Sequence, residues 1–338
     1  MTKHQRVLKD VSRRHFVLGG ARGAAAVVLG LSSPARSQAI RGTARILIGV
    51  PPGTPLDAMA RLLADQMKTY AASTILEVRS GAGYRLALEA AKNSPPDGSV
   101  MVLAPAGPMA LYPHIYKSLN YSPQQDFAPV STLYTTASLL AVGKMVPESV
   151  KTLADFVGWC RSNPAQSAFG TPGGGSPMHF IGVTLARQAG FEFVHVPYQG
   201  SAPAIQNLLG GQLASAIAPI GSFVPHLKSG ALRALAITGA QRSAILPDVP
   251  TMSEAGYPML VFAEWFGILL PAKTPSEIVN ELNGVIRAAL KSKEVAALVA
   301  NFAMETAGNS PAEFAQLIKA DTDRWAPIVK ASGFSPLD

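Results

Sequence analysis

The sequence predicts a two-domain α/β fold. The chain has 338 residues, 48% of them are apolar and 15% charged, and short β-type runs alternate with helical runs from residue 44 onward. This length favours two domains over one, and the composition suits a chain with a large buried core. Strands that alternate with helices are typical of parallel sheets with crossover helices. The same composition excludes a disordered chain.

In the first half of the mature chain, the elements follow this alternation. Strands are expected at 44–50, 74–79, 99–104, 129–133 and 138–144, with helices from 55 to about 70 and from 84 to 92. The first helix has a clear start, because Thr54 can cap it, Pro55 suits the first helical position and Asp57 lies in the first turn.

The second half follows the same pattern. Strands are expected at 167–170, 193–196, 214–218, 232–238 and 265–270, with helices at 152–161, 178–189, 203–209 and 222–228. Two further helices have strong start signals, Thr274-Pro-Ser-Glu277 and Ser310-Pro-Ala-Glu313, which each combine a capping residue, proline and glutamate.

No polar linker separates the two halves, although a single crossing between domains usually shows one. We therefore expect two apolar strands to cross between the domains, at 139–144 and 265–270, and to form a hinge around a cleft. This topology divides the mature chain into domain 1, made of 40–141 plus 265–338, and domain 2, made of 142–264.

Most of the net charge of +8 lies in the first 39 residues. Seven of the 29 basic residues precede residue 40 against one acidic residue of 21, which leaves 22 basic and 20 acidic residues in 40–338. A net charge of +2 there cannot neutralise many phosphates, so a nucleic-acid partner is excluded. The single cysteine, Cys160, excludes an internal disulfide and a Cys-rich metal site.

Residues 1–39 have the layout of a signal peptide, with a basic head, an apolar run at 24–31 and small residues that end at Ala39, where cleavage is expected. The segment Ser12-Arg-Arg-His-Phe-Val-Leu18 resembles a twin-arginine export signal, with ordinary secretion as the alternative. The apolar run of eight residues is too short to span a bilayer, which takes about 20. We expect a periplasmic protein.

The sequence gives little support for a catalytic site or a metal site. The four histidines of the mature chain (His114, His179, His195 and His226) have no spacing suited to a metal, so no metal site is expected. Ser176 and His179 could act as nucleophile and base, but Gly174-Gly-Ser-Pro-Met178 does not match the Gly-x-Ser-x-Gly elbow. An exported hydrolase is therefore only an alternative. We interpret His179 as a partly buried helix residue that positions the loop before it.

Three loops follow strands and open helices, at 51–57, 81–86 and 173–176. The second lacks the dinucleotide fingerprint and the third lacks the lysine of a phosphate loop, so no cofactor is expected. Open α/β sheets bind ligands at the carboxyl ends of their strands, and unpaired helix-start amides suit an anion. Ordinary turns are the alternative for any one loop, but several such loops on both halves favour a cleft for an anionic ligand.

These loops carry a family resemblance. The matching segments include Val50-Pro-Pro-Gly-Thr-Pro-Leu-Asp57, Pro96-Asp-Gly98, Asp126-Phe-Ala-Pro-Val130, Phe169-Gly-Thr-Pro-Gly-Gly-Gly-Ser176, His195-Val-Pro-Tyr-Gln-Gly200, Leu209-Gly-Gly-Gln212, Pro225-His-Leu-Lys-Ser-Gly230, Leu246-Pro-Asp-Val-Pro-Thr251 and Trp265-Phe-Gly267. From 45 to 334, the sequence resembles the Bug family, the extracytoplasmic solute receptors of tripartite tricarboxylate transporters. The resemblance implies a two-domain periplasmic binding protein of the Venus flytrap, type II-like fold. It also implies a carboxylate held by main-chain amides and ordered water and delivered to membrane permease subunits.

The resemblance implies a set of ligand-binding residues, in which Asp57 is expected to shape its loop rather than touch an anion. The set is Pro51, Pro52, Gly53, Thr54, Asp57, Ala104, Ala106 and Gly107 in the first domain, and Thr171, Gly173, Gly174, Gly175, Ser176, Tyr198 and Ala218 in the second. Thr54 replaces a glycine of many members, so the pocket shape can differ. Ala218 lies near the position where relatives that bind amino acids use an aspartate. We therefore expect a carboxylic acid without an amino group, such as an aromatic or a small dicarboxylic acid. The expected protein is a monomeric binding protein and not an enzyme, with a ligand sensor for a membrane signalling partner as a further alternative.

Overall fold

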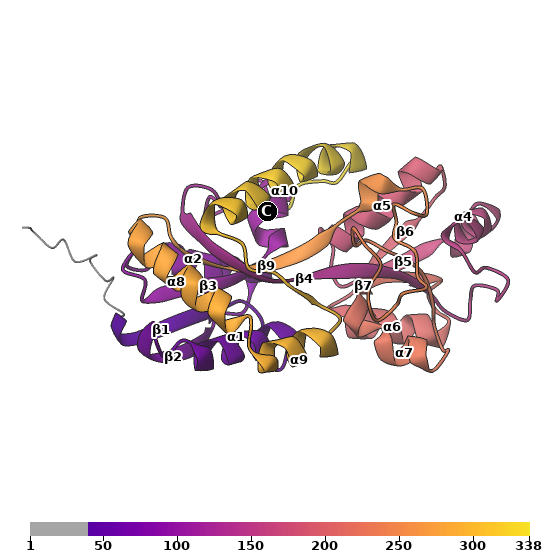
Figure 1. Cartoon of the computed structure of the whole chain (residues 1–338). Helices are drawn as coiled ribbons and strands as arrows, with labels where there is room; N and C mark the ends of the chain where they lie inside the picture. The colour runs from indigo at the N-terminus through magenta and orange to yellow at the C-terminus, as the bar shows by residue number, and fades with distance from the viewer. Residues whose placement is uncertain (1–39) are drawn as a thin grey trace, which may run out of the picture. The chain divides into compact units, whose positions relative to one another are not determined.

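A computed structural model describes residues 40–338 (Figure 1). The expected signal peptide, its twin-arginine segment and its cleavage point lie outside the described residues. Between residues 40 and 338, no helix is both long enough and apolar enough to cross a membrane. The described chain forms two groups of strands that share strand β4 (Phe127–Val142).

The first strand group contains both parallel and antiparallel pairs. It consists of β1 (Ile40–Ile48), β2 (Ala71–Val78), β3 (Val100–Pro105), β9 (Ala263–Pro271) and the first part of β4, in the order β2-β1-β3-β9-β4. β1 is parallel to β2 and β3, whereas β9 is antiparallel to β3 and β4. A two-residue strand, β10 (Glu305–Thr306), also pairs with β4. β1 and β3 therefore end at the same edge of this group.

Helices from both ends of the described chain accompany the first strand group. They are α1 (Pro55–Gln66), α2 (Arg85–Lys92), α3 (Tyr112–Ile115), α8 (Ser276–Ala289), α9 (Lys293–Asn301) and α10 (Pro311–Ser332). The predicted start of α10 is confirmed by a capping box between Ser310 and Glu313. The predicted cap of α8 is wrong. The Thr274 hydroxyl donates to the Pro271 carbonyl, and the helix begins at Ser276 without a side-chain cap.

The second strand group contains three parallel strands, with β5 (Ala168–Thr171) between β6 (Val194–Pro197) and β7 (Ser215–Pro219). β7 and β8 (Arg233–Ile237) both pair antiparallel with the end of β4. Its helices are α4 (Leu153–Ser162), α5 (Pro177–Ala189), α6 (Ser201–Gly210) and the short α7 (Val224–Lys228). As in the first group, the loops after the parallel strands lead into helices.

Strand β4 corrects one sequence prediction. Two strands were expected at 129–133 and 138–144, but β4 is a single strand of 16 residues. It remains unbroken because the intervening Tyr134 to Ala137 pair with Phe266 to Ala263 of β9. Two smaller corrections concern α1, which ends at Gln66 rather than near Tyr70, and α7, which begins at Val224 rather than at Ser222.

The chain passes between the strand groups twice, along β4 and then into β9. Thr238 joins the two crossings, because its hydroxyl donates to the carbonyl of Phe262 and accepts from the amide of Ser138 at 2.9 Å. The predicted two-domain α/β fold with two strand crossings is confirmed. Paired strands rather than a loop therefore form the hinge.

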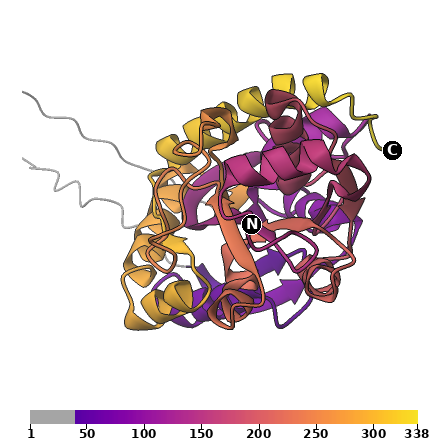
Figure 2. The same ribbon diagram turned by 90° about the vertical axis from the view of Figure 1, so that its right-hand side faces the viewer.

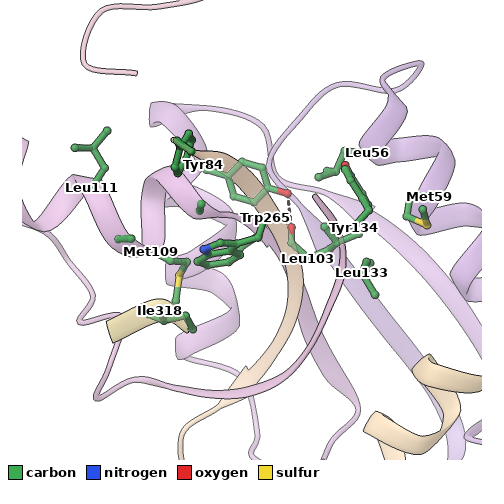
Figure 3. Packing of buried hydrophobic residues seen from close by; sticks show 14 of the residues in the cluster. Leu56, Met59, Tyr84, Leu103, Met109, Leu111, Leu133, Tyr134, Trp265 and Ile318 are labelled. Atoms are coloured by element: carbon green, nitrogen blue, oxygen red, sulfur yellow. Dashed lines mark hydrogen bonds between the residues drawn. The ribbon is translucent and has the colours of Figure 1, made fainter. Parts of the chain in front are cut away.

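The core beneath the first strand group combines aromatic and aliphatic side chains (Figure 3). The Tyr84 hydroxyl donates to the Leu103 carbonyl, which satisfies a polar group inside this core. Trp265 is 1% exposed, and its indole N–H donates to a carboxylate oxygen of Asp321 on α10 at 2.7 Å. This hydrogen bond fixes α10 against the crossing strand β9.

Helix α10 also contacts the second strand group. It lies along the upper edge in both views and approaches α5 (Figure 1, Figure 2). The ring of Phe180 on α5 lies 6.1 Å from Trp325 on α10 and 5.4 Å from Phe334, measured between centroids. Aromatic packing therefore joins the two groups on this side, in addition to the crossing strands.

Candidate functional site

A cavity of about 370 Å³ lies between loops that follow strands of both groups. Its lining includes Val50, Thr54, Pro55 and Leu56 after β1 and Pro105 at the end of β3. It also includes Ser201 at the start of α6 and Pro219, Gly221 and Ser222 at the end of β7. β1, β3 and β7 therefore bring their carboxyl ends to one space, which is where open α/β sheets bind ligands. A larger groove of about 620 Å³ lies between α5, α10 and the turn Pro258–Leu260, and none of the loops that follow the parallel strands contributes to it. We take the cavity at the strand ends as the candidate site.

The loop before α1 is shaped by its own side chains. The Thr54 hydroxyl caps α1 by accepting from the Asp57 amide at 3.2 Å. The Asp57 carboxylate accepts from the Gly53 amide at 3.0 Å and forms an ion pair with Arg61 at 3.0 Å. The hydrogen bond from Arg61 lowers the pKa of Asp57, against the opposing effect of burial. Asp57 thus holds the loop, while Pro51, Pro52 and Gly53 are exposed.

The predicted floor residues lie close to the cavity but are mostly covered. Ala104 and Ala106 are fully buried, and Pro105 between them lines the cavity. Gly107 begins a π-helical turn, Gly107–Leu111, and a carboxylate oxygen of Glu264 lies 3.8 Å from where a Cβ on Gly107 would be. The Glu264 carboxylate therefore already occupies the space in front of this glycine.

The glycine loop before α5 forms a compact hydrogen-bonded turn. The Ser176 hydroxyl donates to the Gly173 carbonyl at 2.8 Å and accepts from the His179 amide at 3.3 Å. The His179 ring accepts from the Gly175 amide through Nδ1 at 3.2 Å. The Ser176 hydroxyl and the His179 ring are thus each engaged with the loop backbone. These contacts indicate that both side chains stabilise the conformation of the loop.

His195 supports the same loop from β6. Its ring stacks on His179 with centroids 3.8 Å apart, and its Nε2 lies 2.7 Å from the Thr171 hydroxyl. That hydroxyl donates its one hydrogen to the Gly173 carbonyl at 3.0 Å, so His195 donates from Nε2. Burial lowers the pKa of both rings, and the neighbouring His179 helps to lower that of His195 to about 4. Both rings are therefore neutral at pH 7.

The structure brings only some of the predicted site residues to the cavity. Thr54 lines it, and Ala218 is fully buried in β7 next to Pro219, which lines it. The glycine loop follows β5 and is not part of the cavity wall among the described residues. A Cβ on Gly175 would lie 3.0 Å from Ile115 of α3, so this loop directly faces the first strand group. Tyr198 accepts from the side-chain amide of Asn207 at 2.8 Å.

Several cavity residues were missed by the sequence analysis. They are the apolar Tyr84, Tyr134, Phe266, Phe302 and Met304 and the polar Thr136, Ser201 and Ser222. Tyr134 and Phe266 are ladder partners, and their rings stack at 4.5 Å. Sequence alternation marked these strands but could not show which face lines a cleft. Ser201 had a signal, because it closes the loop that follows β6.

The cavity wall has no charged side chain among its lining residues. The uncapped end of α6 faces it instead. Gly200 occupies the N-cap position of this helix without a side-chain hydrogen bond, and Ser201 lines the cavity. Free helix-start amides favour an anion, and the aromatic wall favours an apolar body. Residues 40–338 contain no group of three or more His, Cys, Asp or Glu side chains that could hold a metal ion.

Comparison with known proteins shows consistent similarity. A family model described as tripartite tricarboxylate transporter family receptor matches residues 59–334. Protein BugT of Bordetella pertussis is 31% identical over 291 residues, which cover 86% of this chain and 89% of BugT. A solved structure of Rpa4515 from R. palustris with adipate is 31% identical, with a TM-score of 0.77 over 87% of this chain and 98% of that one. MatC from Rhodopseudomonas palustris with bound malate is 28% identical, with a TM-score of 0.72 over 85% of this chain and 98% of that one.

Proposed function

The chain belongs to the tripartite tricarboxylate transporter receptor family, and we propose that it captures a small carboxylate in the cavity at the strand ends. The observation that carries this proposal is the cavity itself, where strand ends of both groups and the uncapped start of α6 meet without a charged lining residue. Solved relatives with adipate and with malate support a carboxylate as the solute. Delivery to the permease subunits of a tripartite transporter completes the function.

Main-chain amides supply the attraction in this proposal. A helix start contributes about 0.3–1 kcal/mol to an exposed anion and up to about 2 kcal/mol to a partly buried one. Hydrogen bonds to a charged group add about 1.5–3 kcal/mol each. A micromolar complex needs about 8 kcal/mol, so four to six such contacts are enough without an arginine. We propose that the α6 start makes the first of these contacts from Ser201.

The remaining predicted site residues join when the two strand groups close. We propose that the loop at 51–54 and the glycine loop at 171–176, with Tyr198, then contact the solute from opposite sides. Their positions at the ends of β1, β5 and β6 support this arrangement. Closure requires that the solute interacts better with the closed form than with the open one. The permease then recognises the closed form. The proposed domains are 40–141 plus 265–338 and 142–264.

The cavity wall indicates the chemistry of the solute. The half-buried Phe266 and Phe302, backed by the buried Tyr84 and Tyr134, give this wall an apolar surface that suits an aromatic ring or a methylene chain. Ala218 has no charge that could hold an ammonium group. We therefore propose a carboxylic acid without an amino group. Calorimetry in which amino acids bind more tightly than their deaminated counterparts would contradict this part.

A screen of the mature protein, residues 40–338, tests the proposed function. A ligand that binds only the folded protein raises its melting temperature, so mono-, di- and tricarboxylates are compared by thermal shift and the hits by calorimetry. We expect at least one acid to bind with micromolar affinity. Failure of every carboxylate, with binding of uncharged solutes instead, would overturn the proposal.

The protein is proposed to bind the solute without changing it. The engagement of Ser176 and His179 with their own loop supports this, because neither contacts the other as nucleophile and base. Mass spectrometry after prolonged incubation should return every bound acid unchanged. We also propose a monomer, which light scattering checks, and twin-arginine export. A reporter fused to residues 1–39 should lose export when Arg13 and Arg14 are replaced by lysine.

A further inference from the structure

Glu264 lies on the face of the crossing strands that carries the cavity wall. In the antiparallel ladder between β4 and β9, Tyr134 is paired with Phe266 and Thr136 with Glu264. Side chains two residues apart on a strand point to the same face. Tyr134, Thr136 and Phe266 all line the cavity. The Glu264 side chain therefore extends the same wall by one ladder step.

This carboxylate has no cationic partner. Within residues 40–338, no ion pair involves Glu264, although its side chain is only partly exposed. Burial raises the pKa of Glu264 to about 7, the negative charge of Asp321 adds to the rise, and a hydrogen bond from the Gly107 amide opposes it. Tyr112 and Tyr134 are the other titratable side chains that interact with it. A buried carboxylate without a cation favours a hydrogen-bond donor and disfavours a second anion.

We infer that Glu264 determines which solutes the cleft accepts, by binding a hydrogen-bond donor at the end of the solute remote from the captured carboxylate. A monocarboxylate with a hydroxyl group at its other end is the class that fits. This inference rests on the proposed function, because it assumes that helix-start amides hold the carboxylate end. A fully ionised dicarboxylate would place its second charge next to Glu264, where like charges repel in a poorly solvated site.

Two sets of acids of matched shape test the inference at pH 8 by calorimetry. The aliphatic set is ω-hydroxyhexanoate, hexanoate and adipate, and the aromatic set is para-hydroxybenzoate, para-toluate and terephthalate. For whichever set binds, we expect the hydroxy acid to bind at least about tenfold more tightly than the dicarboxylate, since like-charge contacts at an interface cost several kcal/mol. The methyl compound should lie between them.

The variant Glu264→Gln removes the charge and keeps the shape. We expect it to bring the hydroxy acid and the dicarboxylate to within about threefold of each other, mainly by tightening the dicarboxylate. Glu305→Gln, which removes an exposed carboxylate from β10, serves as the control and should leave the wild-type preference unchanged. Circular dichroism and the melting temperature confirm that both variants are folded.

The outcomes separate the two claims. If the wild type binds acids of either set but Glu264→Gln leaves the ratio of the two affinities unchanged, the inference is wrong and the proposed function stands. A wild type that prefers the dicarboxylate also overturns the inference. If the wild type binds no acid of either set and no carboxylate in the wider screen, the proposed function fails and the inference fails with it.

Discussion

His179 and His195 stack with their ring centroids 3.8 Å apart and their planes inclined by 15°, next to the glycine loop that precedes α5. One ring accepts from the Gly175 amide and the other contacts the Thr171 hydroxyl, so together they hold both ends of this loop. Two neutral imidazoles can stack this closely, whereas two protonated ones would repel. We therefore expect the shape of the loop to depend on pH.

The first prediction concerns His195. Its pKa is about 4 in the folded protein and 6.5 ordinarily, so the unfolded chain takes up a proton first as the pH falls. The stability that His195 contributes is present above pH 6.5 and is lost as the pH falls toward 4. We expect the melting temperature of wild type to fall more steeply over this range than that of His195→Gln. Parallel curves for the two proteins would contradict the expectation.

The contribution of Glu264 to stability depends on pH in the opposite direction. Its pKa rises from 4.5 to about 7 on folding, so the folded protein holds the proton that the unfolded chain releases. Stability therefore decreases as the pH rises from about 4.5 to 7, by at most about 3.5 kcal/mol at about 1.4 kcal/mol per pKa unit. Glu264→Gln should be more stable than wild type at pH 8 and equal to it at pH 4. Urea denaturation at the two pH values measures the difference. If the substitution changes the free energy of unfolding equally at pH 4 and pH 8, the charge of Glu264 is not the cause of the change.

Gly174 tests whether the glycine loop takes part in binding. A Cβ at Gly174 would meet only the Cβ of Pro197, at 3.9 Å, so a side chain fits there. Gly174→Asp should weaken carboxylate binding at least about tenfold by placing a like charge at the loop, without lowering the melting temperature. Gly174→Asn has the same size without the charge and should bind nearly as wild type. If Gly174→Asp binds carboxylates with unchanged affinity, the solute does not contact this loop.

Thr54 is predicted to matter for stability as well as for the cavity wall. Thr54→Ala removes the hydroxyl that caps α1, which costs about 1 kcal/mol on average for such a change. Thr54→Ser keeps the hydroxyl and should restore most of that loss. Chemical denaturation of the three proteins gives the values. If the alanine and serine variants are equally stable, the cap does not contribute.

Replacement of two glycines of the first strand group by alanine should change the stability of the protein in opposite directions. A methyl group on Gly267 in β9 would overlap the ring of Phe314 and approach the Ser131 carbonyl oxygen to 2.9 Å. Gly267→Ala should therefore cost about 1–3 kcal/mol, the range for overpacking a core. Gly284 in α8 has no atom within 4 Å of its Cβ position, so Gly284→Ala should stabilise by about 0.5–1 kcal/mol. The midpoints of urea unfolding compare both with wild type.

Local signals in the sequence predicted those elements whose start residues bond within one turn. Thr54 and Ser310 each cap the helix that follows them, because the hydroxyl and the amide it receives lie three residues apart. Thr274 carried the same signal, but its hydroxyl bonds backward to Pro271 instead. The unbroken β4 depends on pairing with β9, which comes more than 120 residues later in the chain. No local pattern contains that information.

The position of the site could be predicted from the sequence, but most of the residues that line the cavity could not. The order of strands and helices indicated loops at strand ends, and the cavity lies among such loops. Phe302 and Met304 reach it from the segment after α9, and their contribution depends on how α9 packs against α1. Glu264 precedes a tryptophan in an apolar run, so its sequence position gave no sign of an unpaired carboxylate near the cavity. Which of the predicted glycines touch a solute stays a prediction.

The shared strand β4 also limits where the chain can be divided into separately expressed fragments. One continuous backbone supplies hydrogen bonds to β9 at its beginning and to β7 and β8 at its end. Halves expressed from separate gene fragments would therefore each lack a neighbour for their sheets and expose unpaired edges, which promote aggregation. Circular permutants opened in a surface loop keep β4 whole, so they should tolerate rearrangement better than any split within this strand.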